Sequence, residues 1–221
     1  MKQLVVLLVI CQGALTTFAQ SAKYNDAMTK AIAEMDTLRN TGQFIALSNK
    51  FERIAFAEKN QWLPYYYAAL SRVNSQYFTD DFSLTDDIMD VAQRQIDVAD
   101  SLMPNNSEII LVKALVLRTR IFVHPMTRGA SFGRQSSELI ELAMQLDPEN
   151  PRTYLEMGQS LFYVPPQFGG GADQACPYIA KAKEKYAAFK PLSPLHPNWG
   201  ETRMHELWMQ CGFAADPGQD D

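Results

Sequence analysis

The sequence has few of the residues that build metal centres and nucleophilic active sites. It contains only three histidines and three cysteines in 221 residues. His124, His196 and His205 are scattered, and no pair has the close spacing that zinc ligands show. No Gly-x-Ser-x-Gly segment is present, and nothing in the sequence pairs Cys176 with a particular histidine as nucleophile and base. We therefore expect no metal, no cofactor and no catalytic residue.

Clusters of positive charge are also missing. The formal net charge is −5, from 20 basic and 25 acidic side chains, and no basic run stands out. A modest acidic balance without basic clusters excludes nucleic acid and anionic membranes as partners. Beyond the N-terminus, no apolar run reaches the about 20 residues that a membrane-spanning helix needs. We expect no stable membrane insertion.

Strand patterns are scarce as well, and this absence favours an all-α fold. Valine and isoleucine are sparse, and strict polar–apolar alternation is rare. Apolar residues instead recur at intervals of three and four, the period of an amphipathic helix. Tyr24, Met28, Ala31 and Met35 form one such stripe. The pattern predicts about nine helices.

The N-terminus has the organisation of a secretory signal peptide. Lys2 supplies the charge, Leu4 to Ile10 forms the apolar stretch, and Ala19 ends a small-residue cleavage site. Cleavage after Ala19 would place the protein in the periplasm or outside the cell. A lipoprotein with Cys11 as its lipid-bearing residue is the alternative, but Ile10 is bulkier than such signals accept. The Phe-Ala-Gln junction resembles exported proteins of the Bacteroidota.

A repeat recurs along the remaining chain. Ser101–Asn106 matches Gln145–Asn150, so Pro104 and Pro148 stand about 44 residues apart, and Pro191 follows at a similar distance. Such periods indicate stacked helix pairs. We expect one domain over 20–213, with units near 61–104, 105–148 and 149–191, flanking N-terminal helices, a C-terminal capping helix and a flexible acidic tail over 214–221.

Over roughly residues 44–191 the chain resembles the tetratricopeptide repeat family. Residues 151–162 carry an aromatic, a large apolar and a glycine residue at the positions of that family's first helix, and the next segment keeps its small–large–small spacing. The resemblance implies antiparallel helix pairs stacked as a short solenoid, which bind other proteins. The residues expected to pack the repeats are Ala92, Ile96, Ala99, Ala114, Ala143, Tyr154, Gly158, Ala175, Ile179 and Ala182.

The units depart from that family because each is longer than its repeat of about 34 residues. The extra residues fall between the two helices of a unit, where His124–Gly129 and Pro165–Gly171 are typical of loops. One hypothesis is that these segments form a ridge that contacts a partner, since aromatic and arginine side chains dominate binding hot spots. The alternative is that they fold back and cap the helix ends. The residues concerned are Tyr77, Phe78, Phe82, His124, Arg128, Phe132, Arg134, Tyr163 and Phe168.

Two local features have competing interpretations. Gly169–Gly171 precedes a helix and could cradle an anion, but no strand precedes it and no lysine or hydroxyl follows, so a chain reversal is favoured. Cys176 and Cys211 would lie side by side at the ends of an antiparallel helix hairpin, which predicts a disulfide in an oxidising compartment. Two buried thiols are the alternative.

These observations favour a non-catalytic scaffold or adaptor of the cell envelope, whose partner is another envelope protein or a peptide. The alternative is a periplasmic accessory protein that binds a small solute for a transport system. An apolar pocket between helices with a few convergent polar groups would favour the alternative. The oligomeric state and the biological process do not follow from the sequence.

Overall fold

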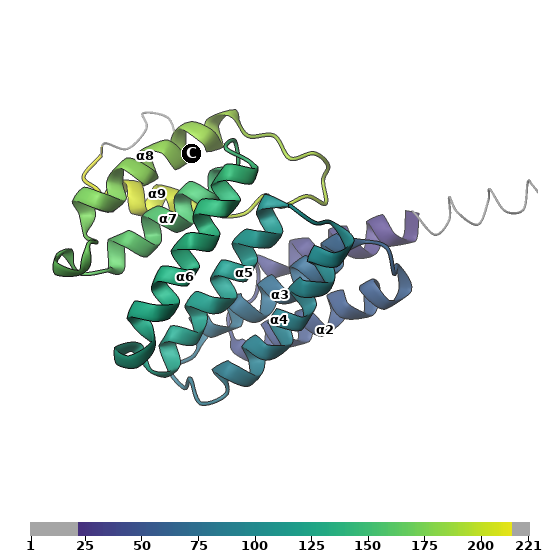
Figure 1. Cartoon of the computed structure of the whole chain (residues 1–221). Coiled ribbons are helices and arrows are strands. Elements are labelled where there is room, and N and C mark those ends of the chain that lie inside the picture. The colour runs from purple at the N-terminus through teal and green to yellow at the C-terminus, as the bar shows by residue number, and fades with distance from the viewer. Residues whose placement is uncertain (1–21, 214–221) are drawn as a thin grey trace, which may run out of the picture.

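The computed structural model describes residues 22–213, and these form helices joined by turns and loops (Figure 1). The predicted signal peptide and the tail over 214–221 lie outside the described residues. A first helix covers residues 22–35. It is followed by α2 (Thr41–Ala57), α3 (Trp62–Ser75), α4 (Thr85–Leu102), α5 (Ser107–Thr119), α6 (Pro125–Leu146), α7 (Pro151–Tyr163), α8 (Ala172–Ala188) and α9 (Glu201–Gln210). Three short 3-10 helices, Gln76–Phe78, Arg120–Val123 and Pro166–Phe168, follow α3, α5 and α7.

The helices stack in chain order as antiparallel pairs, and the prediction of an all-α fold with about nine helices is confirmed. The closest packing joins α2 to α3, α5 to α6, and α7 to α8. Gly158 of α7 shows why a small residue is needed here. A Cβ atom at Gly158 would lie 2.5 Å from Cδ1 of Ile179 on α8, so glycine lets the two helices approach.

The repeated segment is a helix cap. Asn106 and Asn150 precede α5 and α7, and each side chain accepts hydrogen bonds from the first backbone N–H groups of its helix. Asn150 also ties the two units together, because its amide donates to Ser107 Oγ at 3.0 Å. Ser107 in turn donates to the carbonyl of Ala143 in α6. The sequence repeat therefore marks the points at which consecutive units join.

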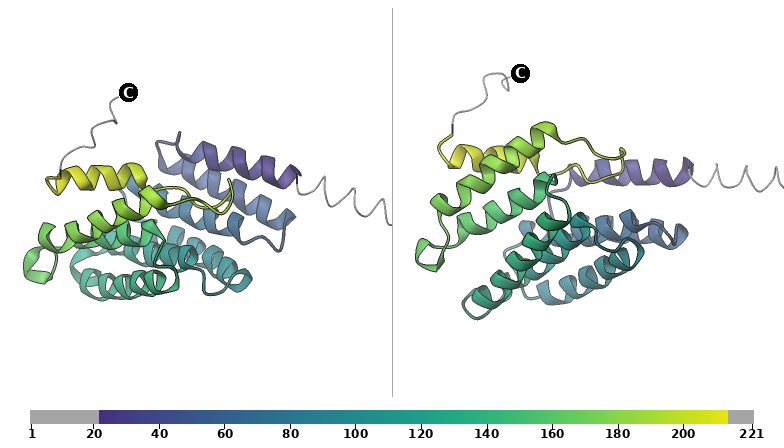
Figure 2. Two further views of the ribbon diagram at one scale, coloured as in Figure 1. Left: turned by 90° about the horizontal axis from the view of Figure 1, so that it is seen from above. Right: turned by 45° about the horizontal axis from the view of Figure 1, so that its top comes forward.

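The loop over residues 190–200 returns to the start of the domain, which a purely sequential stack would not require. Figure 2 shows it extending toward the N-terminal helices in both views. Leu195 is buried in the same apolar cluster as Phe51, and its carbonyl accepts a hydrogen bond from Tyr67 Oη of α3 at 3.0 Å. Trp199 packs against both this cluster and the next one. The loop thus closes one side of the domain.

The interpretation of His124–Gly129 as a loop is wrong, because α6 begins at Pro125. Proline suits the first position of a helix, where its missing N–H is not needed. Gly129 and Gly133 are accommodated within α6, where a Cβ atom at either position would have nothing within 4 Å. Loops join the helices of the first unit, over residues 79–84, and those of the third unit, Pro165–Gly171, where Gly169 and Gly171 have φ angles of 86° and 95°. These positive φ angles, which glycine adopts readily, reverse the chain direction at this turn, as the sequence favoured.

The predicted disulfide is confirmed. Cys176 of α8 and Cys211, which caps α9, are bonded, with Cα atoms 5.7 Å apart. The bond fixes the last helix to α8. The residues expected to pack the repeats lie inside the stack, where all are buried except Tyr154, which is half-buried.

Candidate functional site

The candidate site is a cavity of about 560 Å³ at one end of the helix stack. We call it the helix-end cavity. Its walls come from the starts of α3, α5 and α7, the ends of α4, α6 and α8, and the loop that follows α8. Antiparallel pairing brings these termini together, because every second helix begins where its neighbours end. The cavity therefore collects residues from six helices that are distant in the sequence.

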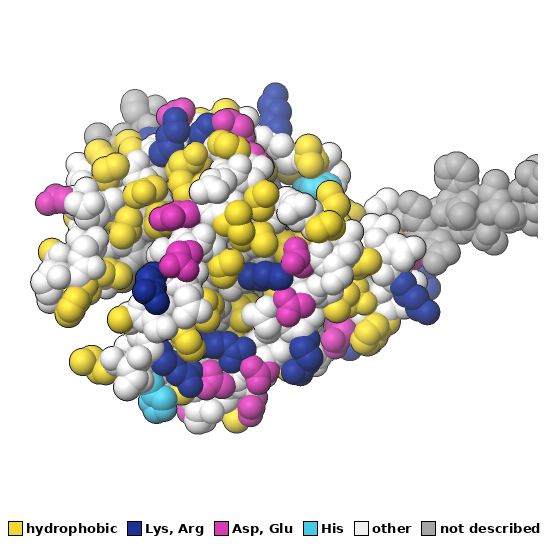
Figure 3. Space-filling view, viewed as in Figure 1, with side chains coloured by type: hydrophobic (Ala, Val, Ile, Leu, Met, Phe, Trp, Pro, Cys, Tyr) yellow, Lys and Arg dark blue, Asp and Glu magenta, His cyan; other side chains and the backbone are white. Residues whose placement is uncertain are grey.

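Apolar and aromatic side chains form much of the wall. Trp62, Leu146 and Phe189 line the cavity together with Met103, which is 46% exposed, and Leu192, which is 88% exposed. Figure 3 shows hydrophobic side chains gathered on the face that carries the starts of α5 and α7. Apolar side chains left in contact with water around a concavity mark a binding surface more often than isolated ones do.

A buried polar network lies beneath this wall. Arg152 at the start of α7 is 2% exposed, and its Nε donates to Oε1 of Glu108 on α5 at 2.8 Å. The same carboxylate accepts from Asn150 at 2.7 Å and from Tyr66 Oη at 3.1 Å. Tyr66 Oη accepts from the indole N–H of Trp199 at 2.8 Å. Burial, and then the nearby Glu108, raise the pKa of Tyr66 well above its usual value, so the phenol keeps its proton and donates it.

One nitrogen of Arg152 has no hydrogen-bond partner among the described residues, although it is buried. The guanidinium stacks on the ring of Phe189, with Cζ 4.5 Å from the ring centroid, and lies 5.9 Å from that of Trp199. Burial by itself lowers the pKa of Arg152, but the charge and the hydrogen bonds of Glu108, together with Tyr66 and Tyr186, raise the pKa above its ordinary value. Arg152 is thus charged and fixed in place, and one nitrogen of its guanidinium has no acceptor for its hydrogens among the described residues.

Three further polar groups stand at the rim. Lys185 near the end of α8 pairs with Glu149 at 2.5 Å, and Lys190 lies exposed just beyond α8. His196 Nδ1 lies 2.8 Å from Ser193 Oγ. Burial lowers the pKa of His196, so its imidazole is neutral at pH 7.

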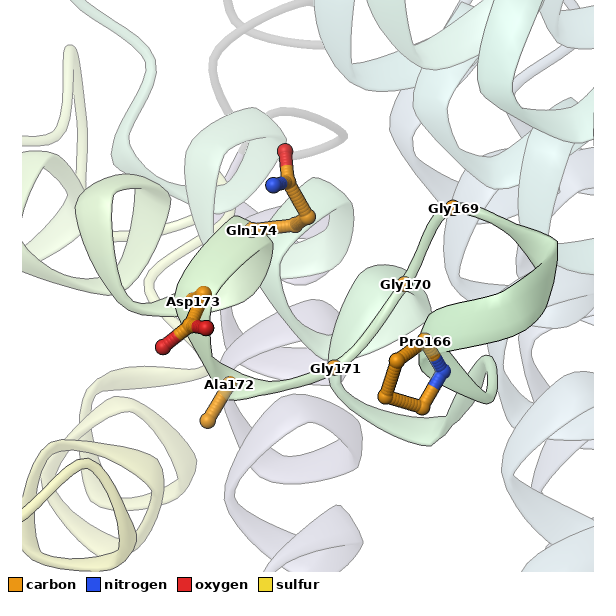
Figure 4. A pocket seen from close by; sticks show the side chains of 7 residues that line it. All are labelled: Pro166, Gly169, Gly170, Gly171, Ala172, Asp173 and Gln174. Atoms are coloured by element: carbon orange, nitrogen blue, oxygen red, sulfur yellow. The ribbon is translucent and has the colours of Figure 1, made fainter.

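A second hollow of about 510 Å³ lies at the glycine turn before α8 (Figure 4). Pro166, Gly169–Gly171 and the first residues of α8 line it. Figure 4 shows Asp173 and Gln174 pointing in different directions from the first turn of α8, with Pro166 beside the glycines. The one charged lining residue, Asp173, is an anion, so the lining does not favour binding of an anion.

The residues predicted to contact a partner lie at the other end of the helices, and none of them lines the helix-end cavity. Several contact the body of the domain. Phe78 stacks on Phe44 and Phe82 packs against Phe122, each with ring centroids 5.2 Å apart. Phe168, in contrast, is 77% exposed. The helix-capping alternative therefore describes Phe78 and Phe82, and a contact with a partner stays a prediction for Phe168.

The remaining members of that set are held in different ways. Arg128 donates two hydrogen bonds of 2.8 Å to Asp86 of α4 and lies over the ring of Phe132. Tyr163 Oη accepts from Arg203 at 2.6 Å, and Tyr77 faces Arg118. His124 and Arg134 are exposed at the start and on the surface of α6.

Neither a metal centre nor a membrane-spanning helix is found in residues 22–213. Nowhere in this range do three His, Cys, Asp or Glu side chains converge as metal ligands would. None of its helices combines the length and apolar character needed to cross a bilayer.

Sequence reasoning missed the helix-end cavity, although the repeated segments Ser101–Asn106 and Gln145–Asn150 supply several of its lining residues. Trp62, Glu108, Arg152 and His196 are separated by long stretches of chain. A further available signal was the position of Glu108 and Arg152, each two residues after the asparagine that ends a repeated segment.

The chain is similar to a solved structure, the HusA haemophore from Porphyromonas gingivalis. The two share 32% sequence identity and a TM-score of 0.78, over 85% of this chain and 92% of the other. No family model matches the chain, and no curated protein matches it either, so the resemblance to tetratricopeptide repeats is not confirmed. The similarity and the disulfide indicate an exported, all-helical protein.

Proposed function

This chain belongs to the family of the HusA haemophore, and on that premise we propose that it is a non-catalytic, exported protein that binds haem in the helix-end cavity. The observation that carries the proposal is the cavity itself, which combines apolar and aromatic side chains with polar and charged groups from several helices. This combination also favours binding of a small solute over the role of a scaffold, because a scaffold needs no such cavity.

The cavity suits haem in size and in character. Its volume of about 560 Å³ falls in the range of small-molecule sites, about 300–1,000 Å³. Haem is a flat, mostly apolar ring, and rings of this kind gain binding energy by contact with aromatic faces and aliphatic side chains. Trp62 at the start of α3, Met103 at the end of α4, and Phe189 and Leu192 after α8 offer such contacts. Met103 and Leu192 are exposed in the structure, so their burial by a ligand would be favourable.

Haemin titration tests the proposal. We expect residues 20–221 to bind haemin saturably, with a change in the Soret band. Met103→Ser and Leu192→Ser together should raise Kd by at least about tenfold, since each replacement removes an apolar contact of roughly 1.5–3 kcal/mol. Met126→Ser is the matched control, because Met126 is 97% exposed at the opposite end of the helices.

Two outcomes would count against haem binding in this cavity. One is the absence of saturable binding by the unaltered chain. The other is an unchanged Kd in the Met103→Ser/Leu192→Ser variant while circular dichroism shows an unchanged fold. Equal losses in this variant and in Met126→Ser would point to non-specific adsorption of haemin.

A further inference from the structure

The helix-end cavity is lined by three cations and by three carboxylates, Glu108, Asp147 and Glu149, of which Glu108 pairs with Arg152 and Glu149 with Lys185. Arg152 comes from the start of α7, and Lys185 and Lys190 come from the end of α8 and the residue pair that follows it. These two helices pack against each other, so the three cations belong to one wall. The part of the lining that comes from the start of α3 and the end of α4 presents the neutral side chains of Trp62 and Met103.

The ion pairs with Glu108 and Glu149 leave hydrogen-bonding capacity on the three cations. Lys185 pairs with Glu149, and their side chains are 13% and 75% exposed, so water competes for the carboxylate and the pair contributes little to stability. Lys190 is exposed at the rim. Arg152 binds Glu108, but that carboxylate also accepts hydrogen bonds from Asn150 and Tyr66. One guanidinium nitrogen of Arg152 has no partner among residues 22–213.

We propose that the wall formed by Arg152, Lys185 and Lys190 binds the carboxylates of the ligand, so that a flat dicarboxylate enters with its acidic edge toward α8 and its apolar edge toward Trp62 and Met103. This inference rests on the proposed function, because it assigns an orientation to haem, whose two propionates lie on one edge of the ring. Lys185 and Lys190 make the outer contacts. Arg152 supplies the inner positive charge, and a small movement of the Phe189 ring that stacks on it would open the guanidinium to a carboxylate.

Esterified ligand separates recognition of the carboxylates from recognition of the ring. Haemin and haemin dimethyl ester share the ring and the iron but differ in the charge at the acidic edge. We expect the unaltered chain to bind haemin at least about tenfold more tightly than the ester in the same mixed solvent, and we expect this ratio to fall as salt is added.

The lysines are then replaced. Lys185→Gln/Lys190→Gln should lower the affinity for haemin, leave the affinity for the ester unchanged, and so reduce the ratio toward one. Lys181→Gln is the matched control, since Lys181 also lies on α8, pairs with Glu184, and does not line the cavity. It should leave the ratio unchanged.

The outcomes separate the two proposals. If neither haemin nor its ester binds, the proposed function fails. If both bind equally well to the unaltered chain, or if the lysine variant keeps the full preference for haemin, carboxylate recognition by this wall is overturned while haem binding stands.

Discussion

The Glu108–Arg152 pair beneath the helix-end cavity gives a prediction whose magnitude follows from burial. Replacing Arg152 by methionine keeps the apolar stem and removes the charge. The carboxylate of Glu108, with 13% of its side chain exposed, would then lose its guanidinium partner. Breaking a buried pair from one side costs about 3–5 kcal/mol, because an uncompensated charge is left behind. Asn150 and Tyr66 still donate to Glu108, so we expect the lower end, about 3 kcal/mol.

The double variant Arg152→Met/Glu108→Met should recover part of this loss. It leaves no buried charge, and its remaining cost is the acceptor lost by Asn150 and Tyr66, roughly 1 kcal/mol for each hydrogen bond. Buried ion pairs replaced on both sides by apolar residues are often close to neutral in stability. We therefore expect the double variant to be more stable than Arg152→Met by about 1–2 kcal/mol.

Urea unfolding followed by circular dichroism measures these differences, with comparable slopes confirming that the same surface is exposed. Lys30→Met is the control, because Lys30 pairs with Asp26 on the surface and such pairs contribute about 0–1 kcal/mol. A double variant whose loss equals the sum of the two single losses would refute the reasoning, since it would show that the two charges do not depend on each other.

Three further predictions concern other parts of the domain. Replacing Cys176 and Cys211 by serine should lower the free energy of unfolding, measured with urea, by about 3–4 kcal/mol, because their bond closes a loop with a separation of 35 residues. An equal urea midpoint for the unaltered chain with and without reductant would contradict this. Hydrogen bonding to Arg128 lowers the pKa of Asp86 below its ordinary value. The stabilisation that it brings is complete above about pH 4 and lost as the pH falls through the lowered pKa, so Asp86→Asn should reduce the acid dependence of stability in a series of melts between about pH 2 and 6. Phe168→Ser should leave the melting temperature unchanged, because the side chain is 77% exposed, and a large drop would show that Phe168 caps the fold.

Local signals account for what could be predicted from the sequence. The three-and-four spacing of apolar residues identified the helices, since each must bury one face. The repeated segments Ser101–Asn106 and Gln145–Asn150 were recognised as a repeat, and the structure shows that their last residues, Asn106 and Asn150, cap the helices that follow. The disulfide followed from an antiparallel hairpin, which fixes which helix ends meet. Each of these inferences needs only neighbours in the chain or the adjacent helix.

The early start of α6 could not be predicted in this way. Gly129 and Gly133 have low helix propensity, so the segment is typical of a loop. The helix is held there by a contact from another unit, the pairing of Arg128 with Asp86 of α4. Tertiary contacts of this kind override helix propensity and produce no local sequence pattern from which the helix start could be predicted.

The helix-end cavity is different, because part of it was encoded in the repeat. Glu108 and Arg152 occupy the same position in consecutive units, two residues after Asn106 and Asn150. Stacked repeats place equivalent positions next to each other, so a glutamate in one unit and an arginine in the next must meet, and their Oε1 and Nε atoms lie 2.8 Å apart. Since helix starts recur at one end of such a stack, opposite charges at equivalent early positions predict a buried pair at that end. In this chain the pair lies beneath a concavity where apolar side chains, cations and aromatic rings converge, so register within the repeat carries information about the site that residue type alone does not.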